Sequence, residues 1–197
     1  MTGTTKAGIL WISPMTPTKI FVGPEQLLRD SFTLAASIYH SGYRPDFLLV
    51  IWRGGTPIGI AVHEFLEYRG WTTDHATVKA VSYVGVEDRM EPQVESMDSV
   101  ISSLKRGSRV LLVDDIFDTG STVKKISEIL APVGVDLKIA TVFYKEEKNT
   151  TDIVPDYYVH VTNDWIVFPH ELMELSMDEV KEKDPFIHGL LNDQPEA

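Results

Sequence analysis

Residues 110–122, VLLVDDIFDTGST, combine an apolar strand, an acidic pair and a turn of small residues. The run at 110–113 is continuously apolar, which is typical of a strand buried on both faces of a parallel sheet. Two adjacent carboxylates, Asp114 and Asp115, follow it. Residues 118–122 then provide a turn with three hydroxyl groups. A helical pattern comes next, with apolar residues at positions 123, 126, 129 and 130.

This order of elements predicts a site for a phosphorylated ligand. The turn would present backbone N–H groups and hydroxyls at a helix N-terminus, where phosphate binds favourably. The acidic pair, a few ångströms away, would offer oxygens to sugar hydroxyls or to a metal ion.

Three other interpretations fit the same stretch less well. An apolar run ending in two aspartates resembles a Walker B strand, but the chain has no G-x-x-x-x-G-K-[ST] to hold a triphosphate. A phosphatase-type D-x-D would separate the acids by one residue, and here they are adjacent. A purely structural turn would leave two carboxylates at the end of a buried strand without a role, which is costly.

The whole stretch resembles the phosphoribosyl-pyrophosphate (PRPP) signature of the type I phosphoribosyltransferases. The resemblance implies that Asp114 and Asp115 face the ribose 2- and 3-hydroxyls and a magnesium ion. Asp118 would contribute to the PRPP site and lie beneath N7 of a purine, where a carboxylate suits general-base catalysis. Four further residues would hold the 5-phosphate: Thr119, Gly120, Ser121 and Thr122.

Composition sets the limits on partners and compartment. The chain has 197 residues, of which 43% are hydrophobic and 24% charged, as in an ordinary globular protein. It contains no cysteine, which excludes disulfides and thiolate chemistry and fits a reducing, cytoplasmic compartment. The formal net charge of −11 argues against nucleic acid as a partner, and no apolar run is long enough for a membrane span.

A second glycine-rich turn follows the apolar run Phe47–Trp52. Arg53, Gly54 and Gly55 would let backbone amides and a guanidinium approach phosphate closely, although a simple turn has the same residues. The turn resembles the pyrophosphate-binding loop of the purine phosphoribosyltransferases. In that family the peptide before the basic residue is often cis, so we expect a cis Trp52–Arg53 bond.

Residues 85–92 form a polar segment without periodicity, which is typical of a lid or of a disordered acidic loop. The preceding Ser82 and Tyr83, together with Arg89, resemble the catalytic lid of the 6-oxopurine phosphoribosyltransferases. A closing lid would keep water from an oxocarbenium-like centre, and Arg89 would cover the pyrophosphate.

The base site is expected from two later segments. In the family, a lysine after the corresponding strand reaches the purine O6, and Lys145 after IATVFY resembles it. Trp165 resembles the residue that stacks on the purine, and Ile166 the one whose main chain reads its edge. Glu171 stands where the family usually has an aspartate near the second metal, so it is the third candidate metal ligand. His160 and His170 have no partner at metal-ligand spacing, so we assign them no role.

Alternating strands and helices predict an α/β fold with a mainly parallel twisted sheet flanked by helices and a small C-terminal hood. We expect one phosphoribosyltransferase domain over residues 1–197. It would consist of an N-terminal arm (1–22), a catalytic body, the hood (150–175) and an acidic tail (176–197). The hood could also include the N-terminal arm. Other expected elements are a helix from Pro24 to Gly42, a helix opened by Pro57, strands at 76–84, 137–144 and 156–162, and helices at 97–104 and Met177–Lys183.

The resemblance implies a purine salvage enzyme that transfers the phosphoribosyl group of PRPP to hypoxanthine, guanine or xanthine, with Mg²⁺ as cofactor. It also implies a homodimer or homotetramer. The family reads the C2 substituent largely through backbone carbonyls, so the sequence does not rank the three bases. Two alternatives stay open. One is a non-catalytic regulator that senses PRPP or purine, and the other is a phosphoribosyltransferase for adenine, orotate or uracil.

Overall fold

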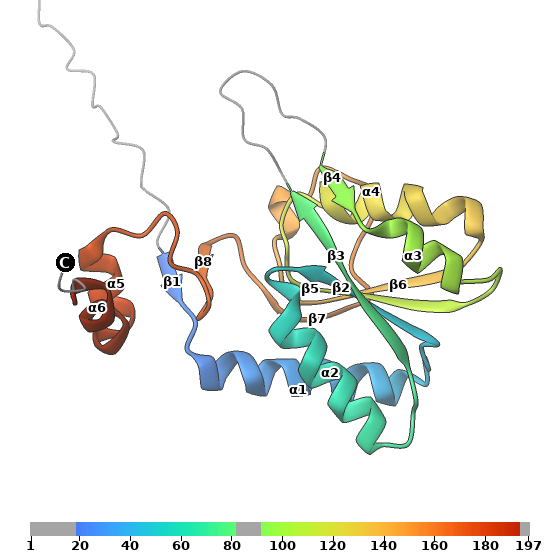
Figure 1. Cartoon of the computed structure of the whole chain (residues 1–197), viewed down its shortest axis with the longest axis horizontal. Helices are drawn as coiled ribbons and strands as arrows, with labels where there is room; N and C mark the ends of the chain where they lie inside the picture. Colours follow the sequence, from blue (N-terminus) through green and yellow to red (C-terminus); the bar gives the residue numbers. More distant parts are fainter. Residues whose placement is uncertain (1–18, 82–91, 194–197) are drawn as a thin grey trace, which may run out of the picture.

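The computed structural model describes residues 19–81 and 92–193, and its main body is a six-stranded sheet between two layers of helices (Figure 1). The strand order is β4-β3-β2-β5-β6-β7, and every neighbouring pair is parallel except β3 and β4. The strands of this sheet are β2 (Phe47–Trp52), β3 (Asp74–Val81), β4 (Gln93–Glu95), β5 (Arg109–Phe117), β6 (Asp136–Tyr144) and β7 (Tyr157–Val161). The expected α/β class with a mainly parallel sheet is confirmed.

The helices cover both faces of the sheet because its central strands are apolar on both faces. Leu48 and Val50 of β2 pack with α1 (Pro24–Ser41) and α2 (Gly55–Tyr68). The alternate residues Leu49 and Ile51 pack with α3 (Met97–Ser103) and α4 (Ser121–Leu130) on the other face. Successive residues of β5 likewise face the two helix layers in turn. This explains why β2 and β5 are unbroken apolar runs in the sequence.

Helix α1 follows its local sequence signals closely. Pro24 occupies the first turn, where its missing N–H costs nothing, and Gly42 ends the helix in the left-handed conformation at φ 78°. The described part of the chain has no helix long and apolar enough to cross a bilayer. Two short 3-10 helices, η1 (Ala131–Val133) and η2 (Glu146–Lys148), complete the main body.

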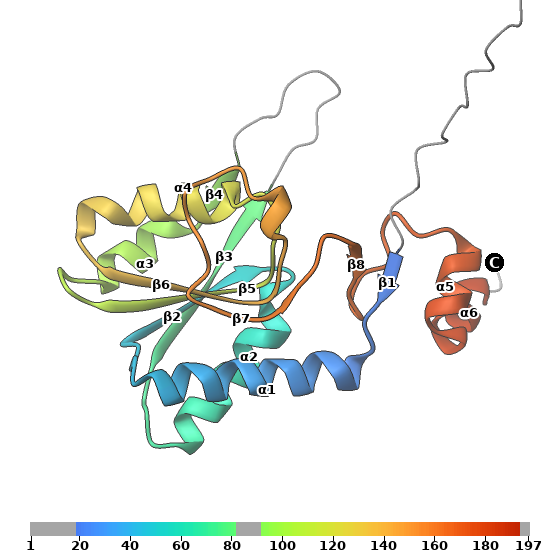
Figure 2. The same ribbon diagram turned by 180° about the vertical axis from the view of Figure 1, so that it is seen from behind.

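A small second sheet lies beside the main body and builds the hood. Strand β1 (Lys19–Phe21) pairs in parallel with β8 (Trp165–Val167), so the end of the N-terminal arm contributes to the hood as expected. Beyond it lie α5 (Met177–Lys183) and α6 (Pro185–Asn192), on the side of the β1–β8 pair away from the main sheet (Figure 2).

Polar contacts hold α5 to the hood. Lys19 pairs with Glu179 at 2.6 Å, and this bond, followed by those from Ser176, lowers the pKa of Glu179 to about 2. Lys183 donates to the carbonyl oxygen of Phe168 at 2.7 Å and to that of Glu171. The first turn of α5 is closed by a capping box between Ser176 and Glu179.

The structure differs from the sequence expectations in three local ways. Strand β5 does not end before the acidic pair but continues to Phe117, because Asp114, Ile116 and Phe117 keep pairing with β6. Helix α2 begins at Gly55, two residues before Pro57. Helix α6 was not expected, and it starts where Asp184 accepts hydrogen bonds from the amides of Phe186 and Ile187.

Candidate active site

The carboxyl ends of β2 and β5 bring the two predicted phosphate-binding turns together at one edge of the sheet. A Cβ atom added to Gly54 would lie 2.0 Å from Oδ2 of Asp115, and one added to Gly55 would lie 2.6 Å from the carbonyl oxygen of Val113. A side chain at Gly55 would collide with the backbone of β5, and one at Gly54 would displace the carboxylate of Asp115. Both glycines are therefore required by close packing against β5, which the sequence alone did not indicate.

The acidic pair is crowded by protein. Asp115 is 7% exposed, and its amide donates to Oδ1 of Asp114 at 3.0 Å. Burial, followed by the neighbouring Asp115, raises the pKa of Asp114 well above its ordinary value. The pair therefore resists carrying two negative charges unless a cation or hydroxyl donors approach it.

These carboxylates fit a magnesium ion by donor chemistry. Mg²⁺ prefers hard oxygen ligands and commonly binds through one or two carboxylates plus substrate phosphates, without a dedicated protein cage. Residues 19–81 and 92–193 contain no group of three or more metal-ligating side chains arranged around a common point. Glu171, the third predicted ligand, instead accepts a hydrogen bond from the amide of Phe168 at 2.9 Å.

The turn between β5 and α4 has the shape expected of a phosphate cradle. Gly120 lies in the left-handed region at φ 79°, and a Cβ there would meet Oγ1 of Thr151 at 2.6 Å. The hydroxyls of Thr119 and Ser121 are 2.9 Å apart, and Thr122 lies in the first turn of α4. The first amides of a helix have no intrahelical acceptor, so this turn offers N–H donors to an anion.

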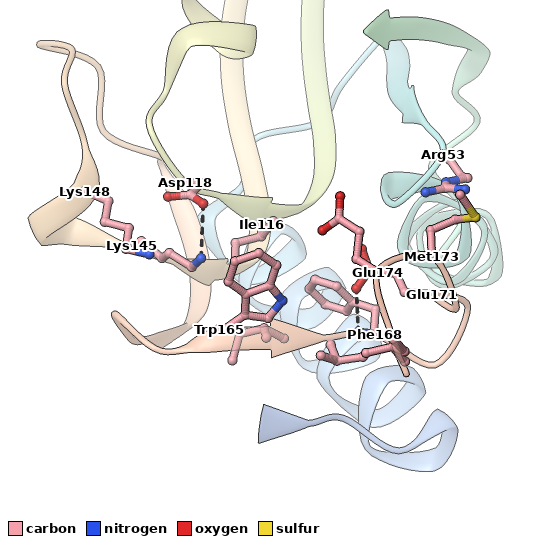
Figure 3. A pocket seen from close by; sticks show the side chains of 13 residues that line it. Arg53, Ile116, Asp118, Lys145, Lys148, Trp165, Phe168, Glu171, Met173 and Glu174 are labelled. Carbon is pink, nitrogen blue, oxygen red and sulfur yellow. Dashed lines mark hydrogen bonds and ion pairs between the residues drawn. The ribbon is translucent and has the colours of Figure 1, made fainter. Parts of the chain in front are cut away.

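Lys145 and Asp118 form the polar pair expected for the base. Lys145 follows β6 and is 5% exposed, and its Nζ donates to Oδ2 of Asp118 at 3.1 Å (Figure 3). The other oxygen of Asp118, Oδ1, is shielded from solvent and has no hydrogen-bond partner among the described residues. An unpartnered carboxylate oxygen beside a buried ammonium group suits a ligand that presents an acceptor next to an N–H donor.

A cavity of about 290 Å³ opens beside this pair, between the sheet edge and the hood. Trp165 of β8 is 42% exposed and lies next to it, whereas Ile166 is buried and paired with Ile20 of β1. A flat apolar face next to Lys145 and Asp118 suits a planar heterocycle. The cavity is lined by Arg53, Ile116, Asp118, Lys145, Lys148, Trp165, Ile166, Val167, Phe168, Glu171, Met173, Glu174 and Leu175.

Arg53 lines this cavity on the side away from Lys145 (Figure 3). The Trp52–Arg53 peptide bond is cis, as expected. The three lid residues, Ser82, Tyr83 and Arg89, lie outside the described residues, and their roles stay predictions.

The structure adds two cavity residues that the sequence pattern does not single out, Lys148 and Glu174, and it gives a contact to His170, to which we assigned no role. His170 stacks on Phe168, and its Nε2 lies 3.6 Å from Oδ2 of Asp115, so a hood residue reaches the acidic pair. Lys148 and Glu174 line the cavity. No local pattern in the sequence marks any of them, because each acts through a contact between distant segments.

Comparison with known proteins identifies the family of this chain. The family model described as "Phosphoribosyl transferase domain" matches residues 24–175. A hypoxanthine-guanine phosphoribosyltransferase of Lactococcus lactis subsp. lactis (strain IL1403) is 31% identical over 141 residues, which cover 71% of this chain and 74% of that protein.

Solved structures agree on the fold. A purine phosphoribosyltransferase from Pyrococcus horikoshii Ot3 matches with a TM-score of 0.65 at 28% identity, over 80% of this chain and 97% of that one. A xanthine-guanine-hypoxanthine phosphoribosyltransferase from Helicobacter pylori matches with a TM-score of 0.59 at 19% identity, over 87% of this chain and all of that one (100%). This chain therefore belongs to the phosphoribosyltransferase family.

Proposed function

We propose that this chain transfers the 5-phosphoribosyl group of PRPP to a 6-oxopurine base, giving the nucleoside 5′-monophosphate and pyrophosphate. The observation that carries the proposal is the pair of Lys145 and Asp118 beside the exposed ring of Trp165. An ammonium group facing O6 and a carboxylate facing N7 match the adjacent acceptor and donor of a 6-oxopurine. They disfavour adenine, because its 6-amino group would place a second donor against the ammonium group of Lys145.

In this proposal the sheet edge binds PRPP. The turn of Thr119, Gly120, Ser121 and Thr122 would hold the 5-phosphate, and the acidic pair would face the ribose hydroxyls. When bound, Mg²⁺ would supply positive charge beside the departing pyrophosphate, with Asp114 and Asp115 as its protein ligands. Glu171 stays a weaker candidate ligand, since one of its oxygens is already hydrogen bonded.

The remaining roles follow from the same arrangement. Arg53, Gly54 and Gly55 would receive the pyrophosphate, and Arg89 would close over it from the lid with Ser82 and Tyr83. Asp118 would accept or orient the N7 proton as the base attacks C1 of the ribose, and Lys145 would stabilise negative charge that develops on O6.

Assembly, compartment and domain organisation are part of the proposal. We expect a cytoplasmic homodimer or homotetramer that acts on PRPP and a purine base, with neither nucleic acid nor membrane as a partner. We also expect residues 1–197 to form one domain, with α5 and α6 as the tail that supports the hood.

The test is pyrophosphate release from PRPP and Mg²⁺ with six bases: hypoxanthine, guanine, xanthine, adenine, orotate and uracil. We expect turnover with at least one of the first three and none with the last three. Turnover only with adenine, orotate or uracil would move the protein to another base class. Saturable PRPP binding without turnover of any base would indicate a regulator.

A further inference from the structure

Glu174 is the carboxylate of the cavity that lacks a protein partner among the described residues. Asp118 accepts a hydrogen bond from Lys145, and Glu171 accepts one from the amide of Phe168. Within residues 19–81 and 92–193, no group makes a hydrogen bond or an ion pair with the side chain of Glu174, although it lines the same cavity. A carboxylate facing a binding cavity without a partner is available to a ligand.

The backbone at Glu174 is unusual. Its φ angle is 68°, in the left-handed region that residues with a Cβ atom adopt only at a cost. Ser96 is the other such residue outside glycine in the described ranges. The conformation turns the segment between Glu171 and α5, and the side chain of Glu174 extends into the cavity (Figure 3).

The position of Glu174 relative to Lys145 and Asp118 defines which part of a base it would face. Figure 3 shows Lys145 and Asp118 on one side of the Trp165 ring and Glu174 on the other. A purine stacked on Trp165 with O6 at Lys145 and N7 at Asp118 directs its opposite edge, which carries the C2 substituent, toward the side where Glu174 lies.

We infer that Glu174 is a specificity-determining residue that reads the C2 substituent and favours guanine over xanthine. The 2-amino group of guanine offers two N–H donors to the carboxylate. Xanthine presents a 2-oxo acceptor and is partly anionic at neutral pH, so the carboxylate repels it. Hypoxanthine has only hydrogen at C2 and lies between the two. This role rests on the proposed transfer to a 6-oxopurine.

The test is Glu174→Gln, an isosteric change whose amide both donates and accepts. The measured quantity is the ratio of kcat/KM for guanine to that for xanthine, with both bases in competition. We expect wild type to prefer guanine and the ratio to fall by about tenfold or more in the variant. The value for hypoxanthine should change less than about threefold.

Glu182→Gln is the matched control. It removes the same charge from an exposed position on α5, outside the cavity, so the ratio should not change. Thermal melting of both variants checks that they fold. A fall of similar size in the control would show a general charge effect and overturn the assignment.

Calorimetric binding of GMP and XMP keeps this inference separate from the proposed function. Wild type should bind GMP more tightly than XMP, and Glu174→Gln should narrow the difference. Turnover of 6-oxopurines with an unchanged guanine-to-xanthine ratio would overturn the role of Glu174 alone. Absence of 6-oxopurine turnover would contradict the proposed function. In that case the role of Glu174 would be overturned as well if Glu174→Gln had the same GMP-to-XMP affinity ratio as wild type, or if wild type bound neither nucleotide.

Discussion

At the sheet edge Asp115 is 7% exposed and its carboxylate lies where a Cβ on Gly54 would be, whereas at the hood Trp165 is 42% exposed on a strand of three residues. The sheet edge is built from strands buried on both faces. The hood is joined to the main body by the burial of Ile166 and Phe168 in the core, and its strand β8 pairs with the short strand β1. Side chains such as Lys183 attach α5 to it. Close packing suits the binding of an invariant ligand, which we propose is PRPP, and an exposed aromatic face suits selection among bases.

The largest effect is expected from Asp118, where a substitution should lower turnover without lowering PRPP affinity. Asp118→Asn should lower kcat by about 10²–10⁴-fold, because the amide cannot take the N7 proton. PRPP affinity, measured by calorimetry with Mg²⁺, should stay within about threefold. Asp152→Asn, which removes the same charge from an exposed position, is the control. Unchanged turnover in Asp118→Asn would remove Asp118 from the mechanism.

The next effect tests the packing of the sheet edge. In Gly54→Ala the new Cβ would collide with the carboxylate of Asp115, so kcat/KM for PRPP should fall by about 10²-fold. Gly23→Ala is the control, since a Cβ there has nothing within 4 Å. Equal effects of the two substitutions on PRPP binding would contradict the role assigned to this contact.

The acidic pair should lower the stability of the ligand-free protein. In wild type the raised pKa of Asp114 means that stability is lost as pH rises through that pKa. Asp114→Asn cannot ionise, so at pH 8 it should unfold with a free energy about 1–2 kcal/mol higher than wild type.

Denaturant unfolding at several pH values measures this difference. The difference in unfolding free energy between Asp114→Asn and wild type should narrow as pH falls toward about 3.9, the ordinary pKa of an aspartate. A variant that is less stable than wild type at pH 8 would show that the pair is not electrostatically strained.

The smallest effect tests the attachment of the hood. Lys183→Met removes the donor to the carbonyl oxygens of Phe168 and Glu171, so KM for the base should rise by about three- to tenfold while KM for PRPP stays unchanged. Lys181→Met on the same helix, at an exposed position, is the control. A change in KM for PRPP as large as that for the base would mean that the sheet edge and the hood do not act independently.

The sequence predicts the sheet edge better than the hood. The apolar runs of β2 and β5 and the motif at 110–122 each carry their information locally, so both glycine-containing turns can be predicted from the residues alone. The continuation of β5 to Phe117 is not predictable in this way, because pairing with β6 overrides the polar signal of two aspartates. Helix α6 does have a local start signal, in Asp184 and Pro185, although we did not expect the helix.

Lys145, Asp118 and Trp165 could be named from the sequence, but other contacts around the cavity could not. His170 meets Asp115 across 55 positions, and Lys148 and Glu174 share a cavity although they come from a 3-10 helix and a turn. Nothing in the spacing of such residues marks them, since their proximity depends on where the hood sits above the sheet.

We propose above that Lys145 and Asp118 recognise a 6-oxopurine. The most direct measurement is formation of the nucleoside monophosphate from hypoxanthine and from adenine, each with PRPP and Mg²⁺, by wild type and by Lys145→Gln. Wild type should convert hypoxanthine at least about 10³-fold more efficiently than adenine, and Lys145→Gln should lose most of that preference. Conversion of adenine at a rate comparable to hypoxanthine by wild type, or an unaltered preference in the variant, would contradict the account.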